Sequence, residues 1–326
     1  MKECLPYIPT FLTAFSLTFL LTPLVYRLAL KLGVLDQPGG RKVHEHPVPK
    51  WGGLAVFLGF FISLAGSIFF VGHFRDALYS TRAVQLAVLM AGGLVMMVMG
   101  ALDDVLDLRP LVKLLVQVLV ASAAVGLGIR ISYVSHPLTE SINYLPLWMG
   151  AGLTILWIVG ISNAMNLLDG LDGLLAGVTT ISALTLFIIS LMKGQIVACF
   201  LLAAVAGSTL AFLRYNFHPA RIFMGDTGSQ FLGFTLACIA VLGALKVTTT
   251  VAVLIPLLVL GLPIFDTSWA IFRRYSAGKH IFHADKDHLH HRLLRLGLSQ
   301  RQVAVIIYLL CGCLGAIAIY LTQGAR

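Results

Sequence analysis

Long apolar stretches recur along this 326-residue chain, and they restrict its fold more than any other feature. A helix that crosses the hydrocarbon core of a membrane needs about 20 apolar residues. The chain has ten such stretches, at about 5–30, 51–72, 82–101, 111–129, 144–162, 172–191, 195–213, 228–245, 247–272 and 302–322. The pattern predicts an all-α fold, a polytopic transmembrane helical bundle of about ten spans.

Composition supports this prediction, because 58% of the residues are hydrophobic and 11% are charged, whereas a soluble domain has about 25% charged residues. Pro256 and Pro263 lie inside the ninth stretch and predict a kink there. The first stretch lacks the basic start and cleavage site of a signal peptide, so we expect it to be retained. With no soluble domain or repeat in the pattern, residues 1–326 are predicted to form one integral membrane domain.

The net charge of +9 raises the question of a nucleic-acid partner. The basic residues lie between apolar stretches instead of on one soluble face, which argues against nucleic acid. An anionic bilayer and a phosphorylated substrate explain them better. The five cysteines form no CxxC pattern, so we expect them to be small apolar filler.

The loops between the ten stretches fall on two alternating sides. Loops on one side hold 5, 2, 0, 2 and 7 Lys and Arg residues, 16 of the 23, at 27–50, 102–113, 163–171, 214–227 and 273–301. The positive-inside rule makes this side cytoplasmic. Eleven of the 14 acidic residues, counting Asp172 and Asp266 at span ends, lie on the same side. Because carboxylates contribute little to topology, their concentration indicates a site.

Three carboxylates end the third stretch, at Asp103, Asp104 and Asp107. On a helix Asp103 and Asp107 share a face, and Asp104 lies beside them. Such a group repels itself unless a cation neutralises it, and hard oxygen ligands suit Mg²⁺. The alternative is an ordinary solvated helix end.

Polar residues recur at every third position of the segment 163–173, at Asn163, Asn166, Asp169 and Asp172. If this segment is helical, they form one polar stripe. Hydrogen bonding between helices would explain one or two buried polar residues. Four at a regular spacing favour a strip that faces a substrate.

Glycines flank Asp226 in the segment 216–229, just before the eighth stretch. A glycine-rich turn at a helix start can aim backbone N–H groups at a phosphate, and Asp226 could ligate a metal there. Ordinary helix capping by Asp, Thr and Ser remains an equal alternative.

Histidines cluster in the most basic loop. His288 and His291 are three residues apart and would share a helical face. Zinc is the rival interpretation, but no cysteine accompanies them and the acidic segments favour a hard ion. We expect hydrogen bonds to substrate phosphates, with Arg292 as charge partner.

The segment 36–53 is too rich in Pro and Gly for a regular helix, and it supplies cations and histidines. In isolation it reads as a positively charged flank. All five segments, however, lie on the same predicted side of the membrane. A metal with converging cations implies a polyanion such as a diphosphate, and a site in the membrane implies that one partner is a lipid.

The five segments resemble the polyprenyl-phosphate N-acetylhexosamine-1-phosphate transferase family. They read RKVHEHPVPKWGG, DDVLD, NAMNLLDGLDGL, NFHPARIFMGDTGS and HADKDHLHHRLLRLG, in the family's order and across nearly the whole chain. HLHHRLL is similar to the WecA/TagO-like branch, which uses UDP-N-acetylglucosamine. The MraY branch, which transfers phospho-MurNAc-pentapeptide, usually has PTMGG where this chain has PKWGG.

The resemblance implies transfer of a sugar-1-phosphate, first of all GlcNAc-1-phosphate, from a UDP-sugar to undecaprenyl or another polyprenyl phosphate, with release of UMP. This is the first membrane step of bacterial envelope polysaccharide synthesis. The expected cofactor is Mg²⁺, with Mn²⁺ as a substitute. The expected location is the bacterial plasma membrane, with the site on the cytoplasmic side. The assembly is left open, with a homodimer as one option.

The resemblance also assigns roles to matching positions. Asp226 is expected to be a metal ligand, with Asp103 and Asn166 near the ion or the diphosphate. Catalytic groups are expected at Asp103 and Asp104, the paired carboxylates, and at Asp169, in a structural or phosphate-facing role. Contacts to the uridine are expected from Asp172, Asn216 and Phe223. Contacts to the diphosphate and the sugar phosphate are expected from Lys42, His288, His290, His291 and Arg292.

Two mechanisms remain open from the sequence. Either the lipid phosphate attacks the β-phosphorus directly, or an aspartate acts first as nucleophile. The rival functions are an MraY-like transferase, a secondary transporter and a zinc hydrolase. Transporters place ionisable groups near the midplane, often between inverted repeats, and zinc proteases show HExxH spacing; this sequence shows neither.

Overall fold

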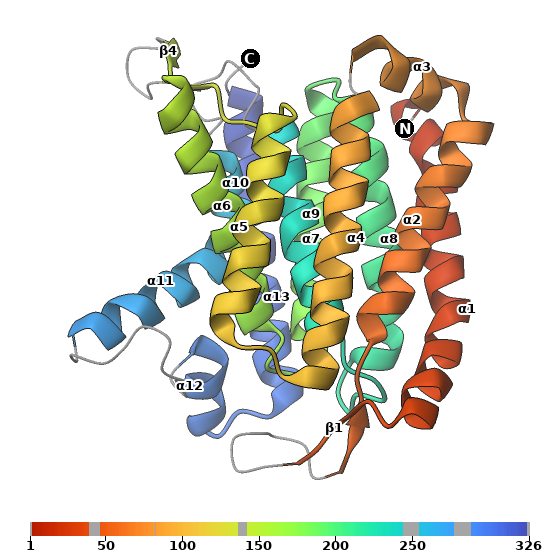
Figure 1. Cartoon of the computed structure of the whole chain (residues 1–326), viewed down its shortest axis with the longest axis vertical. Coiled ribbons are helices and arrows are strands. Elements are labelled where there is room, and N and C mark those ends of the chain that lie inside the picture. The colour runs from red at the N-terminus through yellow and green to blue at the C-terminus, as the bar shows by residue number, and fades with distance from the viewer. Residues whose placement is uncertain are drawn as a thin grey trace.

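A computed structural model describes residues 2–38, 46–81, 83–135, 142–243, 254–276 and 288–324. They form a bundle of roughly parallel and antiparallel helices with two short hairpins (Figure 1). The elements in chain order are η1 (Lys2–Tyr7), α1 (Ile8–Leu32), β1 (Leu35–Asp36), β2 (Val48–Pro49), α2 (Gly52–Phe70), α3 (Gly72–Thr81), α4 (Ala83–Leu106), α5 (Pro110–Gly126), β3 (Tyr133–Ser135), β4 (Ile142–Tyr144), α6 (Leu147–Leu168), α7 (Leu174–Met192), α8 (Ile196–Asn216), α9 (Gly225–Leu242), α10 (Leu254–Val259), α11 (Gly261–Ser276), α12 (Leu289–Arg295) and α13 (Gln300–Gly324).

Seven helices of the described chain are long and apolar enough to cross a membrane: α1 with the end of η1, α2, α4, α6, α7, α8 and α13. Their outer faces carry exposed apolar side chains such as Leu20, Leu156 and Leu309, which are about two-thirds exposed. Large apolar side chains on the outside of a helical bundle are suited to contact with lipid. The predicted polytopic membrane bundle is therefore confirmed.

The helices alternate in direction, so the connections gather at two ends of the bundle. One end carries the hairpin β1–β2 and α12, and we call it the α12 end. The opposite end carries α3, β4 and both chain termini (Figure 1). The described parts of the five predicted motif segments lie at the α12 end, as the alternation of apolar stretches required.

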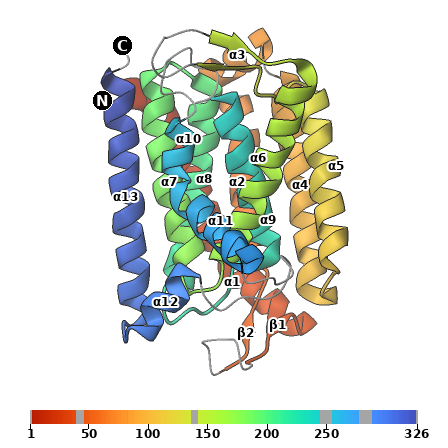
Figure 2. The same cartoon turned by 90° about the vertical axis from the view of Figure 1, so that its left-hand side faces the viewer.

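The centre of the bundle is built around α9, which packs against α4, α6 and α2. Every residue of α9 is buried except Asp226, which lies in its first turn. The buried helices α7 and α8 complete the core (Figure 2). A central helix with one accessible carboxylate at its end fixes that carboxylate with respect to all the surrounding helices.

The predicted ninth span, 247–272, does not form one crossing helix in the part that is described. The helix breaks between α10 and α11, and α11 leaves the bundle at a steep angle (Figure 1). Pro256 and Pro263 lie on either side of the break, where a proline removes a backbone donor and crowds the preceding turn. The expected kink is confirmed. The count of ten spans stays a prediction, because seven helices meet the criteria and α5 is apolar but only 17 residues long.

Two antiparallel hairpins depart from the all-helical expectation. Leu35 pairs with Pro49 and Asp36 with Val48 in the first, at the α12 end. The second joins β3 to β4 at the opposite end. The first hairpin follows Gly33, whose left-handed backbone (φ 71°) ends α1. It matters for the site because it places Asp36 and Lys50 beside the start of α9.

Candidate active site

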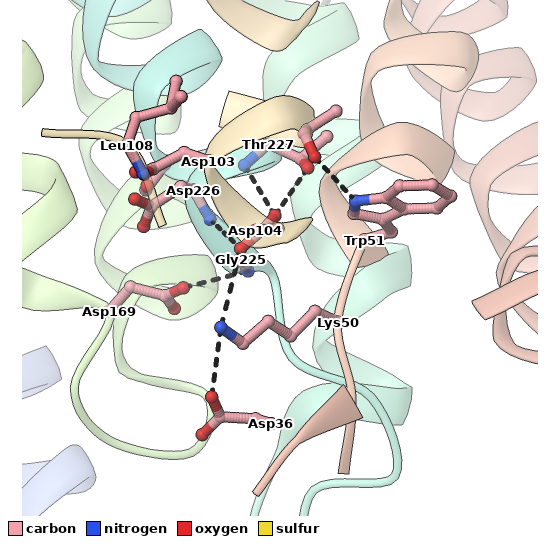
Figure 3. A network of polar contacts seen from close by, with 12 residues as sticks. Asp36, Lys50, Trp51, Asp103, Asp104, Leu108, Asp169, Gly225, Asp226 and Thr227 are labelled. Carbon is pink, nitrogen blue, oxygen red and sulfur yellow. Dashed lines mark hydrogen bonds and ion pairs between the residues drawn. The ribbon is translucent and has the colours of Figure 1, made fainter. Parts of the chain in front are cut away.

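Asp104, at the end of α4, binds the first turn of α9 (Figure 3). One carboxylate oxygen accepts the N–H of Asp226 at 3.0 Å. The other accepts the N–H of Thr227 at 3.1 Å and its hydroxyl at 2.7 Å. Anions are favourable at helix N-termini, where backbone N–H groups have no partner within the helix. Asp104 therefore acts as a cap that α4 supplies to α9.

Asp103 points to a different partner, the ammonium group of Lys113 in the first turn of α5. The Nζ–Oδ2 distance is 2.6 Å, and the same ammonium lies 3.4 Å from Oδ2 of Asp226. The second oxygen of Asp103 accepts the backbone N–H of Leu108 at 2.8 Å. Carboxylates from α4 and α9 thus converge on one positive charge.

The polar stripe predicted on 163–173 reaches the same place from α6. Asn166 donates from its amide nitrogen to Oδ1 of Asp226 at 2.7 Å and to Ser229 at 2.8 Å. Asp169 accepts the N–H of Gly225 at 3.1 Å. Desolvation, followed by the charges of Asp226 and Asp104, raises the pKa of Asp169 well above its ordinary value. The ionised form of Asp169 is therefore unfavourable here unless a cation lies beside it.

Farther up the stripe, Asn163 makes a paired amide contact with Gln117 of α5. Asn163 donates to Gln117 at 2.8 Å, and Gln117 donates to Gln230 of α9 at 2.9 Å. Gln117 and Gln230 are almost completely buried. This amide chain ties α5, α6 and α9 together behind the carboxylates, so Asn163 has a structural role.

Asp172 and Asn216 organise the loop on the far side of Asp169. Oδ2 of Asp172 contacts Nδ1 of His218 at 2.7 Å and accepts the N–H of Ala220 at 3.0 Å. Asn216 accepts from Gly173 at 3.1 Å and donates to the carbonyl oxygen of Ile222 at 2.9 Å. Both residues therefore hold the loops on which they and their neighbours lie.

The first hairpin closes the remaining side with Lys50. Its ammonium lies 3.1 Å from Asp36 and 4.0 Å from Asp104. Burial opposes the charged form of Lys50, but the carboxylates of Asp36, Asp104 and Asp226 outweigh it and raise the pKa of Lys50. The site thus has a second fixed cation, which lies near Asp104.

Close approach of backbones at the start of α9 requires glycine. Gly225 has φ +72°, and a Cβ there would lie 2.5 Å from Oδ2 of Asp104. At Gly53 a Cβ would run into the backbone of Gly228. Backbone hydrogen bonds from Gly52 and Gly53 to the carbonyl oxygens of residues 223 and 224, both 2.9 Å, hold the two segments together. The glycines of both motifs let α2 and α9 begin in contact.

These residues surround one cavity of about 280 Å³ at the α12 end. Its walls are formed by Asp36, Lys50, Asp104, Asp169, Gly170, Leu171, Asp172, Asn216, Phe223, Gly225, Asp226, His291 and Gln300. Four segments far apart in the sequence supply its carboxylates. Five acidic side chains around a lysine and a histidine form a site suited to a cation and a phosphorylated ligand.

The histidine segment covers this cavity from α12. His291 is in the cavity wall. His290 is 2% exposed and packs against Gly170, and burial, followed by His291 and His288, lowers its pKa to about 4. His288 is also buried and pairs with Asp266 of α11. Arg292 is exposed outside the wall.

Most of the residues singled out from the sequence are thus brought together. The cavity wall contains Asp104, Asp169, Asp172, Asn216, Phe223, Asp226 and His291. Asp103 and Asn166 contact Asp226 or its lysine partner directly behind the wall. Lys42 and the residues 281–287 lie outside the described residues, so the role expected for Lys42 stays a prediction.

Sequence reasoning missed several partners. Lys113 is the one charged residue in the apolar stretch 111–129, and Asp266 is the one charged residue in 247–272. An isolated ionisable residue in a predicted span is a signal for function that could have identified both. Asp36, Lys50 and Gln300 had no comparable signal, because they lie in polar loops or at a helix start.

Comparison with known proteins identifies the family. A family model described as glycosyl transferase family 4 matches residues 86–244. The chain is 43% identical over 301 residues to a probable undecaprenyl-phosphate N-acetylglucosaminyl 1-phosphate transferase of Bacillus subtilis (strain 168), covering 92% of this chain and 80% of that protein. The chain belongs to this glycosyl transferase family.

Two further relatives agree. A decaprenyl-phosphate N-acetylglucosaminephosphotransferase of Mycobacterium tuberculosis is 38% identical over 326 residues, covering 92% of this chain and 79% of its own. An undecaprenyl-phosphate alpha-N-acetylglucosaminyl 1-phosphate transferase of Yersinia pestis is 29% identical over 310 residues, covering 94% and 81%. The resemblance stated from the motifs is therefore confirmed.

The region that the family model matches can be compared with the residues that form the cavity. Residues 86–244 run from α4 through α9 and carry four of the five carboxylates of the cavity, while Asp36 belongs to the first hairpin. Two basic side chains of the wall also lie outside that region: Lys50 follows the first hairpin, and His291 is in α12. In this member of glycosyl transferase family 4, the matched core thus supplies most of the acidic groups, and flanking segments complete the cavity.

Proposed function

We propose that this chain transfers GlcNAc-1-phosphate from UDP-N-acetylglucosamine to polyprenyl phosphate and releases UMP. The observation that carries the proposal is the single cavity at the α12 end, where carboxylates from α4, α6 and α9 meet Lys50 and His291. Relatives that match more than nine-tenths of the chain are named as undecaprenyl-phosphate or decaprenyl-phosphate transferases of N-acetylglucosaminyl phosphate, which supports the acceptor and the transferred group. A cavity of about 280 Å³ suits part of a nucleotide sugar, with the remainder in the open mouth.

The oxygen ligands around Asp226 fit a divalent cation. Oxygens of Asp103 and Asp226 already converge on one cation, the ammonium of Lys113. Mg²⁺ prefers such hard oxygen ligands and is commonly held by one or two carboxylates together with substrate phosphates. Among the described residues no group of three His, Cys, Asp or Glu is arranged as a complete metal cage. We therefore propose Asp226 and Asp103, with Asn166 beside them, as residues that would hold Mg²⁺, or Mn²⁺ in its place, with the diphosphate completing the ligand set.

The part of the wall formed by Phe223, Asp172 and Asn216 suits the uridine of the donor. Phe223 lines the cavity beside Asp172 and Asn216. An aromatic ring can stack on uracil, and a carboxylate oxygen can accept its imide N–H. Oδ2 of Asp172 is held by His218 and Ala220, which fixes the direction of the remaining oxygen. We assign Asn216 to shaping this wall, because both of its amide atoms bind backbone.

An apolar groove supports a lipid acceptor. It has a volume of about 480 Å³ and lies between α6 and the helices α10 and α11. Its lining includes Leu153, Leu156, Trp157, Leu257, Ile264 and Ile271. The groove is almost entirely apolar, so it suits a polyprenyl chain whose phosphate is directed to the α12 end.

The proposed reaction is one displacement at phosphorus. An oxygen of the lipid phosphate attacks the β-phosphorus, a new P–O bond forms, and the bond from that phosphorus to the bridging oxygen breaks. The electron pair leaves with UMP. A bound Mg²⁺ would stabilise negative charge on the phosphate oxygens. Lys50 and Lys113 reduce the repulsion between two anionic substrates. A trapped phosphoryl-aspartate would favour the two-step alternative instead.

The α12 end is proposed to face the cytoplasm, because the loops predicted from the sequence to lie on this side hold 16 of the 23 Lys and Arg residues and UDP-sugars are cytoplasmic. We propose the bacterial plasma membrane as the location, in keeping with the bacterial relatives. A homodimer stays a prediction.

The decisive experiment measures UMP. Purified protein is incubated with polyprenyl phosphate and, in turn, UDP-N-acetylglucosamine, UDP-N-acetylgalactosamine and UDP-MurNAc-pentapeptide, each with and without Mg²⁺ or Mn²⁺. The proposal expects UMP and a lipid-linked product with the first donor and a dependence on the metal. Turnover only with the pentapeptide donor would favour the MraY-like alternative. Substrate flux across liposomes without UMP release would favour a transporter.

A further inference from the structure

The carboxylate of Asp266, on α11, binds the start of α12. Its Oδ2 lies 2.9 Å from Nδ1 of His288, and its Oδ1 accepts the N–H of Leu289 at 2.8 Å. Both side chains of the pair are buried, Asp266 at 8% and His288 at 5% exposed. Burying a carboxylate in a stretch predicted to lie in the membrane costs free energy unless hydrogen bonds or an opposite charge compensate it. These two bonds connect segments that are separated by more than 20 residues.

The two bonds fix different features of α12. Leu289 is the first residue of that helix, whose opening N–H groups have no partner within the helix. Asp266 supplies the acceptor that the capping residue His288 does not. The bond to Nδ1 places the proton of a neutral His288 on that nitrogen, since a carboxylate only accepts, and it leaves Nε2 as the acceptor.

The ring of His288 is the first of three in contact. It stacks on His290 with ring centroids 6.0 Å apart and an interplanar angle of 6°. The ring of His290 lies 4.2 Å from that of His291, which is in the cavity wall. His290 also packs against Gly170, in the turn between Asp169 and Asp172. His288 is therefore the first of a row of three histidine rings that ends with His291 in the cavity wall.

We propose that Asp266 is a positioning residue for the transfer reaction, which holds His288 and thereby aligns His291 with the donor phosphates. The inference rests on the proposed function for its activity readout. It also assigns α11 two tasks, because Ile264 and Ile271 of the same helix line the apolar groove. One helix thus borders the groove for the lipid and holds the histidines of the polar cavity.

Asp266→Asn is the test, because it keeps the shape and removes the charge. Asparagine keeps only one of the two acceptor oxygens, and its amide nitrogen is a donor that then opposes either the Nδ1 proton of His288 or the N–H of Leu289. We expect kcat/KM for the UDP-sugar to fall about 10-fold or more. We expect the KM for polyprenyl phosphate to change less than about 2-fold, since the groove lining stays intact. Asp76→Asn, an exposed carboxylate of α3 at the opposite end, is the matched control.

A double-mutant cycle separates positioning from general damage. If Asp266 acts through His288, adding Asp266→Asn to His288→Gln lowers kcat/KM by less than about 2-fold further. Hydrogen exchange gives a readout without turnover. Peptides covering 288–296 exchange faster in Asp266→Asn, while peptides of α7 and α8 keep their protection.

Three results would overturn the inference. They are additive losses in the cycle, a change confined to the KM of the lipid, or unchanged exchange at 288–296. Failure of the proposed function can be distinguished from failure of this inference. If the proposed function is wrong, the unmodified chain releases no UMP from any donor, while the exchange experiment still reports whether Asp266 holds α12.

Discussion

The carboxylate of Asp104 accepts the backbone N–H of Asp226 at 3.0 Å, so the end of α4 holds the first turn of α9. The two residues are 122 positions apart and come from different motifs. This contact separates the neighbouring carboxylates of the DDVLD segment by role. Asp104 organises the start of the central helix, and Asp103 turns to Lys113 and the cation position.

We predict that Asp104→Asn lowers stability as well as activity. In this variant an amide N–H₂ replaces one carboxylate oxygen and faces the donor of Asp226 or the two donors of Thr227, so at least one buried donor loses its acceptor. The expected loss is about 3 kcal/mol, seen as a thermal midpoint lower by roughly 5 °C or more in detergent. Asp107→Asn, an exposed residue of the same segment, should leave the midpoint within about 1 °C. Equal midpoints for the two variants would refute the capping role.

Gly225→Ala is expected to abolish most activity. The residue has φ +72°, and the added methyl group would lie 2.5 Å from Oδ2 of Asp104. Gly297→Ala is the matched control, because Gly297 also has positive φ (+86°) but has nothing within 4 Å of an added Cβ. The backbone cost common to both is about 1 kcal/mol. A loss of UMP release in Gly225→Ala alone would assign the effect to contact with Asp104, and similar losses in both would not.

Lys113→Met should make stability depend more strongly on Mg²⁺. Without the ammonium, the carboxylates of Asp103 and Asp226 lose their common counter-charge, which costs about 3 kcal/mol for a partly buried pair. A divalent cation at 100 times its Kd returns about 2.7 kcal/mol. The measurement is the thermal midpoint with and without Mg²⁺, with the exposed Lys31→Met as control. If both variants show the same Mg²⁺ shift, the cation does not bind beside Lys113.

Asp226→Asn is predicted to lower turnover by about 100-fold or more and to weaken its dependence on Mg²⁺. The substitution removes the charge at the one position of α9 that is not buried, while the asparagine oxygen can still accept from Asn166. UMP release across a series of Mg²⁺ concentrations measures both effects. Near-normal turnover at ordinary Mg²⁺ would remove Asp226 from the metal site.

His290 is predicted to lower stability at acidic pH. Its pKa is depressed to about 4 by burial and by its histidine neighbours, against 6.5 for the unfolded chain. The unfolded state therefore binds the proton first, and the folded state loses up to about 3 kcal/mol of relative stability as pH falls from 6.5 to 4. His290→Gln, which cannot be protonated, should show a shallower fall in thermal midpoint over this window. Parallel curves for the two proteins would contradict the prediction.

The sequence was sufficient to predict the class of fold and the side of the bundle that carries the site. Apolar runs of about 20 residues must be helical in a membrane, because only then are their backbone groups satisfied within the segment. Alternation of these runs then places every second loop at the same end. The sequence was also sufficient to predict most of the carboxylates that line the cavity, since motifs such as DDVLD and GDTGS stand out in an apolar chain.

Only the tertiary structure decided which partner each of these residues has. Lys113 meets Asp226 across 113 positions, and Asp266 of α11 meets His288 of α12. Such pairs depend on how helices are rotated and packed against one another, and no local periodicity encodes that rotation. The prolines in the sequence account for the break in the predicted ninth span. The direction that α11 takes after the break is set by its packing on α6 and α13.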